Sequence, residues 1–326
     1  MIKPEQIFNI NTNKEFEKLA LQVFYYQAEN NLVYKQYLEY LGVNPSEITT
    51  INKIPFLPID FFKYHKIICG TQTEEKVFKS SGTTLDIRSH HFITDLKLYE
   101  HSFNSGFKKF YGDIKDYCIL GLLPSYVENG DSSLVYMVES LIKQSNHHES
   151  GLYLNNYDEL LEIISELEKA KQKYMIIGVS YALLDLAEKN KQKQKNAIIM
   201  ETGGMKGRRK ELPKEELHKI LSDSFGIETI HSEYGMTELL SQAYSFGKGE
   251  FSTPAWMKVL IRDIYDPFTY LQNGKSGGIN IIDLANINSC SFIETKDLGR
   301  INMNNTFFVL GRFDNSDIRG CNLLVE

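Results

Sequence analysis

Apolar residues recur at roughly helical spacing along the first forty residues of the chain. The pattern runs from residue 13 to about residue 41, and Gly42 and Pro45 end it. The positions that carry it are Phe16, Leu19, Val23, Phe24, Leu32, Tyr34 and Leu38. Residues 1–50 are therefore predicted to form a helical N-terminal subdomain. Pro55 and Pro58, which come next, exclude helix and require an extended connection.

Beyond residue 75, short β-like runs alternate with amphipathic stretches. The pattern predicts strands at 76–79, 89–93, 117–123, 174–179, 197–200 and 226–230, and helices at 95–110, 157–171, 181–193 and from about residue 213. This alternation is typical of an α/β fold with a largely parallel sheet. After Pro254, strands follow closely at 257–261, 278–283, 292–295 and 307–310, joined by Gly, Asn and Asp turns. We expect this part to be a more β-rich portion of the same core.

Composition and charge narrow the classes of function. The 326 residues, 42% of them hydrophobic, can bury a large core in one or two domains. A net charge of -6, with scattered Lys and Arg, argues against nucleic acid as the main partner. The N-terminus lacks the apolar core of a signal peptide, and no apolar run reaches the ~18 residues of a membrane span. We therefore expect a cytoplasmic protein. Four cysteines without a CxxC pair indicate neither a disulfide framework nor a structural zinc site.

Two glycine-containing loops follow predicted strands. The first, Ser80-Ser81-Gly82-Thr83-Thr84, offers backbone N–H and hydroxyl donors without bulk, which suits polyphosphate oxygens. It is not a Walker A loop, because no lysine follows the glycine in the required spacing. The second places Gly203 and Gly204 after a strand, where a flat ring or phosphate can approach the backbone. Taken alone, the first is more often an ordinary turn, and the second is equally compatible with one.

Three further segments place polar side chains after strands or in turns. In 231–238, Tyr234 can stack on a purine, Thr237 can bond phosphate, and Glu238 can hold a magnesium ion. In 295–300, Asp297 can accept both hydroxyls of a ribose, and in 311–315, Arg312 adds charge-assisted donors. Individually, the last two segments are more often hairpin turns with a surface ion pair.

The order and combination of the five segments resemble the adenylate-forming enzymes. Their phosphate loop, adenine loop, YGxTE motif, TGDLGR motif and GRxD hinge follow one another in this order. Within that superfamily the chain resembles the acyl-protein synthetase (LuxE-type) branch, which is related to phenylacetate-CoA ligases. The resemblance rests on IPFLPIDFFK at 54–63, FKSSGTT at 78–84 and RGCN at 319–322, and it extends from about residue 50 to the end. It implies a layered α/β adenylate-forming core over 51–310, β-rich after about residue 254, and a hinge remnant and tail over 311–326.

The resemblance also implies the roles of individual residues. Those expected to bind phosphate are Ser80, Ser81, Gly82, Thr83 and Thr84, and those expected to line the adenine are Gly203 and Gly204. Those expected to contact the nucleotide or the acyl group are Tyr234, Gly235, Met236 and Thr237. Glu238 would bind Mg²⁺, and Asp297 and Arg312 would bind the ribose. ATP and Mg²⁺ are the implied cofactors, and the implied catalytic residues are Cys321, Glu238 and Thr83.

Two departures from the family pattern affect the mechanism. Most adenylate-forming enzymes continue for about a hundred residues past the hinge into a mobile domain with a catalytic lysine, whereas the sequence here stops at Glu326. A substitute for that lysine, Lys206 or Arg300, is only a conjecture. Lys296 stands where the family has glycine before the aspartate, which a turn is expected to tolerate.

The resemblance implies that the acyl group passes to Cys321, because acyl-protein synthetases use a cysteine of their own near the C-terminus. A thiolate is a strong nucleophile near neutral pH, and the thioester that it forms stays reactive. Chemistry alone favours a small buried residue at this position, and the resemblance reverses that preference. Cys69, Cys118 and Cys290 lie in apolar surroundings and are expected to be structural.

The implied function is ATP-dependent activation of a carboxylic acid, a fatty acid by resemblance, followed by transfer of the acyl group to a thiol. One alternative is an acyl- or aryl-CoA ligase in which Cys321 is structural. Another is a catalytically silent subunit that binds nucleotide or an acyl group. The 19 Phe and 19 Tyr residues suit a long acyl tunnel or an aryl pocket equally. The acyl acceptor is open between Cys321, coenzyme A, and an acyl-reductase or other acyl-accepting partner protein.

Overall fold

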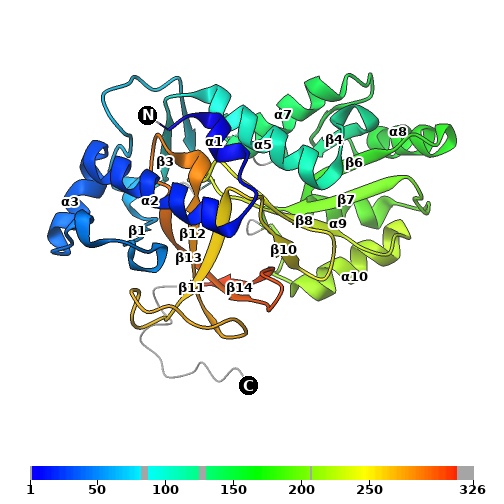
Figure 1. Cartoon of the computed structure of the whole chain (residues 1–326). Coiled ribbons are helices and arrows are strands. Elements are labelled where there is room, and N and C mark those ends of the chain that lie inside the picture. Colours follow the sequence, from blue (N-terminus) through cyan, green and yellow to red (C-terminus); the bar gives the residue numbers. More distant parts are fainter. Residues whose placement is uncertain (1, 82–86, 125–129, 206–207, 314–326) are drawn as a thin grey trace.

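A computed structural model describes residues 2–81, 87–124, 130–205 and 208–313 (Figure 1). One large sheet runs through them, in the strand order β11-β12-β13-β14-β10-β9-β8-β7-β6-β4-β5, with the short β1 (Leu57–Pro58) paired to β13. A separate two-stranded sheet pairs β2 (Lys76–Lys79) with β3 (His90–Ile93). The predicted α/β fold is therefore confirmed.

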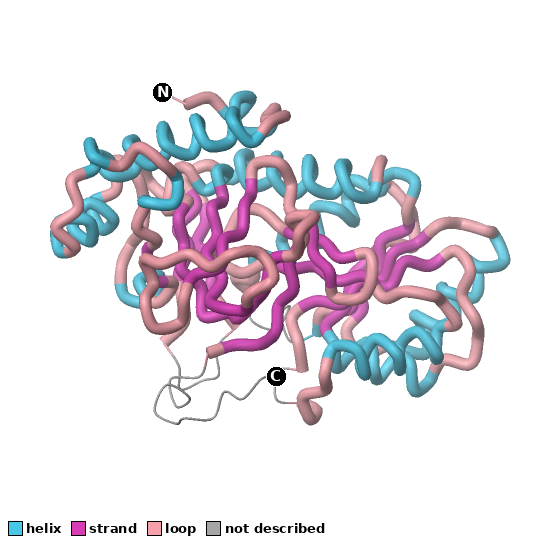
Figure 2. Tube along the Cα trace, turned by 60° about the horizontal axis from the view of Figure 1, so that its bottom comes forward, coloured by secondary structure: helices cyan, strands magenta, loops and turns pink. Residues whose placement is uncertain are grey.

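The parallel half of the large sheet forms from continuous apolar runs. Its strands are β4 (Cys118–Leu122), β5 (Gly151–Tyr153), β6 (Tyr174–Val179), β7 (Ala197–Thr202) and β8 (His231–Tyr234). Every residue of β4 and β6 is buried, as expected for parallel strands that helices cover on both faces. In Figures 1 and 2, α5 (Leu96–Tyr111) and α7 (Ser133–Ser145) lie on one face, and α9 (Ser180–Lys189) and α10 (Lys214–Phe225) on the other. Helix α8 (Tyr157–Ala170) packs beside α9.

The other half of the sheet is antiparallel. Its strands are β9 (Ala243–Ser245), β10 (Glu250–Ser252), β11 (Met257–Arg262), β12 (Ser276–Asp283), β13 (Phe292–Ile301) and β14 (Phe307–Arg312). Strand β8 belongs to both halves, because it is parallel to β7 and antiparallel to β9. The strands predicted after residue 254 are all present, and they are longer than their apolar runs indicated.

Helices at the N-terminus pack against the antiparallel half. They are α1 (Pro4–Phe8), α2 (Asn13–Asn30) and α3 (Leu32–Tyr40), and a one-turn helix α4 (Phe61–Tyr64) follows. A capping box starts α2: the Thr12 hydroxyl accepts from the Glu15 backbone N–H at 3.2 Å, and the Glu15 carboxylate accepts from the Thr12 backbone N–H at 3.0 Å. Phe24 of α2 meets Phe292 of β13 edge-on, with ring centroids 6.1 Å apart. The single pattern over residues 13–41 is thus two helices, divided at Asn31, which caps α3. The remaining helical pieces are single 3₁₀ turns at Pro45–Glu47 (η1), Ile51–Lys53 (η2), Ile114–Asp116 (η3) and Leu284–Asn286 (η4).

Two sequence predictions about local structure are wrong. The expected strand at 226–230 is absent, because Gly226 has a φ of +71° and ends α10 in the left-handed conformation. The strand begins only at His231, so the polar segment at 231–238 starts with strand β8 (His231–Tyr234) and continues into the loop after it. The turn expected around Lys296 is also absent: β13 continues to Ile301, because β12 and β14 pair with it on both sides.

Candidate active site

The loops that follow β7 and β8 lie side by side at the carboxyl edge of the parallel half. Gly203 and Gly204 follow β7 with φ of +71° and +75°, in the left-handed region that favours glycine. A Cβ atom added to Gly204 would meet no atom within 4 Å. Tyr234 ends β8 and is followed by Gly235, Met236 and Thr237. The backbone at Gly204 is therefore open to a flat ring, at the edge where ligands bind in open α/β sheets.

Three predicted ribose and nucleotide residues meet in one cluster, joined by a hydrogen bond and an ion pair. The Tyr234 hydroxyl donates to Asp297 Oδ2 at 2.7 Å, and Arg312 Nε lies 3.3 Å from Asp297 Oδ1. Asp297 and Arg312 are directly opposite each other in the β13–β14 pair. Burial raises the pKa of Asp297, and the Arg312 charge acts against that rise. The cluster joins segments that lie more than sixty residues apart in the sequence.

Glu238, the predicted magnesium ligand, is buried close to this cluster. Burial raises its pKa, while the Ser89 hydroxyl and the Arg312 charge lower it and the Asp297 charge raises it. Ser89 also pairs with Ser80: the Ser89 backbone N–H donates to Ser80 Oγ at 2.9 Å, and the Ser80 backbone N–H donates to the Ser89 carbonyl at 3.0 Å. The start of the predicted phosphate loop and Glu238 are therefore linked through Ser89.

A buried histidine supports the loop that carries Glu238. His91 Nδ1 lies 2.7 Å from the Thr237 carbonyl, and its Nε2 lies 3.0 Å from Asn286 Oδ1. The Asn286 amide donates to the Glu238 carbonyl at 2.8 Å. Burial lowers the pKa of His91 to about 4, so the ring is neutral near pH 7. His91 thus holds the loop in place, and Asn286 is a supporting residue that the sequence analysis missed.

The end of β7 carries a buried carboxylate with a complete set of partners. Glu201 accepts hydrogen bonds from the hydroxyls of Ser180 at 2.8 Å and Ser232 at 3.2 Å, and Lys214 Nζ lies 3.3 Å away. Burial alone would raise its pKa. The His218 hydrogen bond and the Lys214 charge outweigh burial, and the pKa falls to about 2. Glu201 is therefore ionised and fixes helices α9 and α10 to the site edge.

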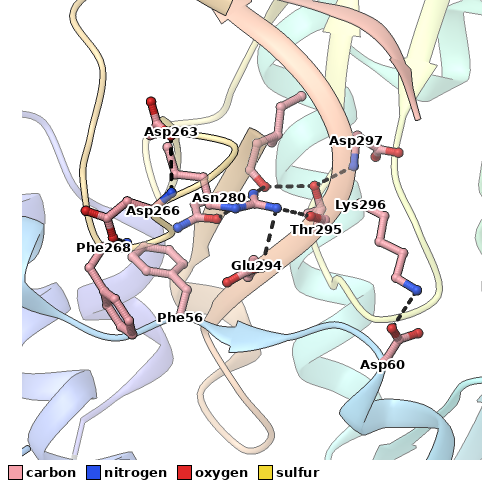
Figure 3. Close-up of polar contacts among 12 residues, drawn as sticks. Phe56, Asp60, Asp263, Asp266, Phe268, Asn280, Glu294, Thr295, Lys296 and Asp297 are labelled. Carbon is pink, nitrogen blue, oxygen red and sulfur yellow. Dashed lines mark hydrogen bonds and ion pairs between the residues drawn. The ribbon is translucent and has the colours of Figure 1, made fainter. Parts of the chain in front are cut away.

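A second buried network, which the sequence did not indicate, supports the backbone at Asp297 (Figure 3). Arg262 donates to the carbonyls of Ile279 at 3.0 Å and Thr295 at 2.8 Å, and to Asn280 Oδ1 at 2.9 Å. The Thr295 hydroxyl in turn accepts from the Asp297 backbone N–H at 3.1 Å. Arginine is mostly exposed in proteins, so no local pattern distinguishes a buried one on a strand.

Lys296 lies on strand β13 and makes a defined ion pair. Its Nζ is 2.5 Å from Asp60 Oδ2, and Asp60 also pairs with Lys63 at 3.0 Å. Asp60 belongs to the IPFLPIDFFK segment, so the lysine ties that segment to the strand that carries Asp297. Of the conjectured substitutes for the catalytic lysine, Arg300 lies over the Phe308 ring at 5.4 Å, and Lys206 falls outside the described residues.

Four of the predicted site residues, Gly82, Thr83, Thr84 and Cys321, also lie outside the described residues, and their roles stay predictions. The three other cysteines are buried, and burial raises the pKa of the Cys118 thiol to about 11 and that of Cys290 to about 12. A thiol so far from ionising is a poor nucleophile. Burial also raises the pKa of Cys69.

The described residues can be tested for fit to the implied ligands. Open glycine backbone, an aromatic ring and an Asp–Arg pair suit a nucleotide. Within the described ranges no three His, Cys, Asp or Glu side chains gather as a metal site. A single carboxylate such as Glu238 still fits magnesium, which is often held by one or two carboxylates plus substrate phosphates. Of the helices described, none is long and apolar enough to cross a membrane.

Solved structures place this fold in the class of adenylate-forming enzymes. A 2-hydroxyisobutyryl-CoA ligase in its postadenylation state aligns over 95% of this chain and 70% of its own, with a TM-score of 0.67 at 11% identity. ATP-bound MatB from Rhodopseudomonas palustris aligns over 72% of this chain with a TM-score of 0.55 at 15% identity. The chain spans about half the length, 47%, of MatB. The fold is that of the large N-terminal domain of these enzymes.

The sequence comparison then indicates the branch. The chain is 23% identical over 318 residues to the long-chain-fatty-acid–luciferin-component ligase of Aliivibrio fischeri, covering 92% of this chain and 82% of the relative. No family model matches the chain. The resemblance to acyl-protein synthetases within the adenylate-forming superfamily, drawn from the motifs, is confirmed. The comparisons also confirm the expected class, an adenylate-forming ligase, at the level of relationship and fold.

Proposed function

We propose that the protein activates a carboxylic acid with ATP as an acyl-adenylate and then transfers the acyl group to a thiol, Cys321. The observation that carries the proposal is the cluster of Tyr234, Asp297 and Arg312, with Glu238 beside it and Ser80 linked to it through Ser89. These residues come from four of the five motifs. The named ligase relative and the ATP-bound structures of the same fold support the same reaction.

In the first step a carboxylate oxygen of the acid attacks the α-phosphorus of ATP. The bond from that phosphorus to the bridging oxygen breaks, and pyrophosphate leaves. The task of the protein is to position the two anions and offset their repulsion. Asp297 and Arg312 would hold the ribose, Tyr234 and the two glycines the base, and the hydroxyl loop that starts at Ser80 the phosphates. A magnesium ion on Glu238 would offset phosphate charge.

In the second step a thiolate sulfur attacks the acyl carbon of the adenylate. The carbon–oxygen bond to AMP breaks, AMP leaves, and a thioester remains. Cys321 is the proposed acceptor because the other three cysteines are buried and burial raises their pKa values, to about 11 for Cys118 and about 12 for Cys290. An acyl-reductase or another acyl-accepting protein would then receive the acyl group from Cys321.

Acid-dependent exchange of labelled pyrophosphate into ATP tests the first step. We expect exchange with at least one fatty acid, and a higher KM for ATP in Asp297→Asn and Tyr234→Phe. Asp158→Asn is the matched control, because that carboxylate is exposed on α8 and, among the residues that the structure describes, pairs with Lys189 alone at 3.0 Å. Nucleotide binding without any exchange would contradict catalysis and indicate a silent binding subunit.

Labelled acid plus ATP tests the second step. We expect a protein-bound label that hydroxylamine releases, that Cys321→Ser abolishes and that Cys290→Ser retains. Coenzyme A is the second candidate acceptor, because a 2-hydroxyisobutyryl-CoA ligase of the same fold was solved in complex with CoA. Label that appears on coenzyme A equally in wild type and Cys321→Ser would favour that acceptor.

A further inference from the structure

Glu233 is a buried carboxyl group that the proposed reaction does not use. It precedes Tyr234 at the end of β8, and successive residues of a strand face opposite sides of the sheet. Tyr234 faces the Asp297 cluster. Glu233 lies near Tyr99, Tyr111 and Tyr244 on the other face. Burial raises the pKa values of these three tyrosines, and the Glu233 charge raises them further. Glu233 therefore lies at the same edge as the proposed nucleotide site, on the face that α5 covers.

One oxygen of Glu233 has a partner and the other does not. Thr202, the last residue of β7, donates its hydroxyl to Oε2 at 2.6 Å. Within the ranges that the structure describes, Oε1 has no hydrogen bond. Oε1 packs against Gly235, where an added Cβ would lie 2.3 Å from it. A larger residue at 235 would therefore displace the Glu233 carboxyl group, and glycine leaves that oxygen beside the loop that follows β8.

A second acceptor belongs to Gln242, whose side chain also approaches Gly235. Gln242 is 7% exposed, and its Oε1 is buried without a hydrogen-bond partner among the described residues. Its Cγ would be 3.4 Å from the same added Cβ. A buried acceptor without a donor costs about 1–3 kcal/mol, so native structures rarely keep one unless a ligand or water supplies the donor. Among the described residues Gln242 Oε1 is such an acceptor, and the side chains of Gln242 and Glu233 both approach Gly235.

The charges around Glu233 favour a donor. Its neighbour Glu201 is ionised and raises the pKa of Glu233, after burial, which is the larger cause. Lys214 Nζ is 3.3 Å from Glu201, and its charge also lowers the pKa of Glu233, but burial and the Glu201 charge outweigh it. Glu233 therefore keeps a raised pKa beside a lysine that pairs with Glu201.

We propose that Glu233 and Gln242 bind a hydrogen-bond donor of the acid substrate, so that the preferred acid is hydroxy- or amino-substituted, a class that includes hydroxy fatty acids. The inference rests on the proposed function and deepens it. The donor would satisfy Glu233 Oε1 and Gln242 Oε1 while the carboxylate of the same molecule lies at the edge of the sheet. A site that hydrogen-bonds a hydroxyl or amino group strongly rejects an analogue without that group. An apolar pocket rejects an analogue that carries the extra group less strongly.

Pyrophosphate exchange with matched acids tests the proposal. The probes are butanoate and dodecanoate, each beside its 3-hydroxy and 3-amino derivative. We expect kcat/KM to be at least tenfold higher for one substituted acid of a set than for its plain parent. Glu233→Leu and Gln242→Leu should remove that preference and leave KM for ATP within twofold of wild type.

Glu233→Gln separates the two donors and guards against misfolding, since it keeps the shape and one acceptor oxygen. It should retain a preference for the hydroxy acid and lose one for the amino acid, which needs the charge. Exchange with the plain acids at equal or higher kcat/KM, or a preference that survives Glu233→Leu, would overturn the inference and leave acid activation intact. No exchange with any acid would overturn both.

Discussion

Replacing Arg262 with methionine should destabilise the protein strongly. The Arg262 side chain is 6% exposed and makes three hydrogen bonds, and Glu294 Oε1 lies 3.4 Å from its Nη2. Breaking a buried ion pair by removing one partner costs about 3–5 kcal/mol, because the remaining charge loses its partner. The Ile279 carbonyl keeps a hydrogen bond from the Thr295 hydroxyl, at 2.8 Å, so it is not left bare. We therefore expect the free energy of unfolding to fall by about 3–5 kcal/mol. The lost hydrogen bonds are not added to this figure, because the contributions of neighbouring interactions are not additive.

Lys258 on the same strand provides a matched control. Its Nζ is 3.8 Å from Glu17, whose side chain is 52% exposed. Exposed ion pairs contribute about 0–1 kcal/mol. Lys258→Met should therefore lower the free energy of unfolding by less than about 1 kcal/mol, although both changes remove one positive charge from β11.

Urea unfolding at pH 7 measures both variants. The single tryptophan, Trp256, is 3% exposed and precedes β11, so its fluorescence reports on this half of the sheet, while circular dichroism reports on the whole. Coincident transitions would justify a two-state free energy. An Arg262→Met protein that loses less than about 1 kcal/mol would refute the reasoning, because the pair would then behave as an exposed one.

Three other outcomes follow from the charges. Burial raises the pKa of Glu233 from 4.5 to about 7, so folding favours its protonated form. This group therefore contributes on the order of 3 kcal/mol to the free energy of unfolding below pH 4.5, and that contribution is lost as the pH rises through 7. Unfolding measured against pH should not show this loss in Glu233→Gln. Because burial lowers the pKa of His91 from 6.5 to about 4, its contribution is present above pH 6.5 and lost as pH falls through 4; a His91→Gln protein whose stability falls as steeply as wild type over that range would contradict this. Lys296→Met should cost less than about 1 kcal/mol in urea unfolding and leave KM for ATP unchanged, because Asp60 keeps Lys63.

The bounds of some strands were predictable from sequence alone. The predicted strands at 76–79 and 174–179 match β2 and β6 in both bounds, and the β6 run is apolar because helices cover both of its faces. The strand predicted at 226–230 is absent, and the local pattern did not indicate this, because Gly226 ends α10 in the left-handed conformation. The continuation of β13 past residue 295 was also missed, because the buried positions there include the polar Thr295 and Asp297, while the less buried ones include Leu298. The sequence therefore lacks the apolar–polar alternation by which a strand is recognised.

The site was predictable as a set of motifs but not as a set of contacts. The order of the motifs indicated a nucleotide cluster, and the structure brings Tyr234, Asp297 and Arg312 together. The residues that support them, Arg262 and Asn286, carry no motif. Asn286 meets His91 across 195 positions of sequence, and nothing local to either residue indicates the other. Partner identity at such separation comes from the topology of the sheet, which the sequence pattern does not fix.

Strand β8 explains why one short segment carries so much of the proposed chemistry. It is the strand where the parallel half meets the antiparallel half, so its carboxyl end borders both the loop after β7 and the strands that carry Asp297 and Arg312. Its residues alternate between faces: Ser232 bonds Glu201, Glu233 bonds Thr202, and Tyr234 bonds Asp297. The nucleotide proposed at Tyr234 and the acid proposed at Glu233 would thus lie on opposite faces of one strand and meet only at its end. The proposed reaction needs that meeting point, because the carboxylate must reach the α-phosphate while the rest of each molecule stays in its own site.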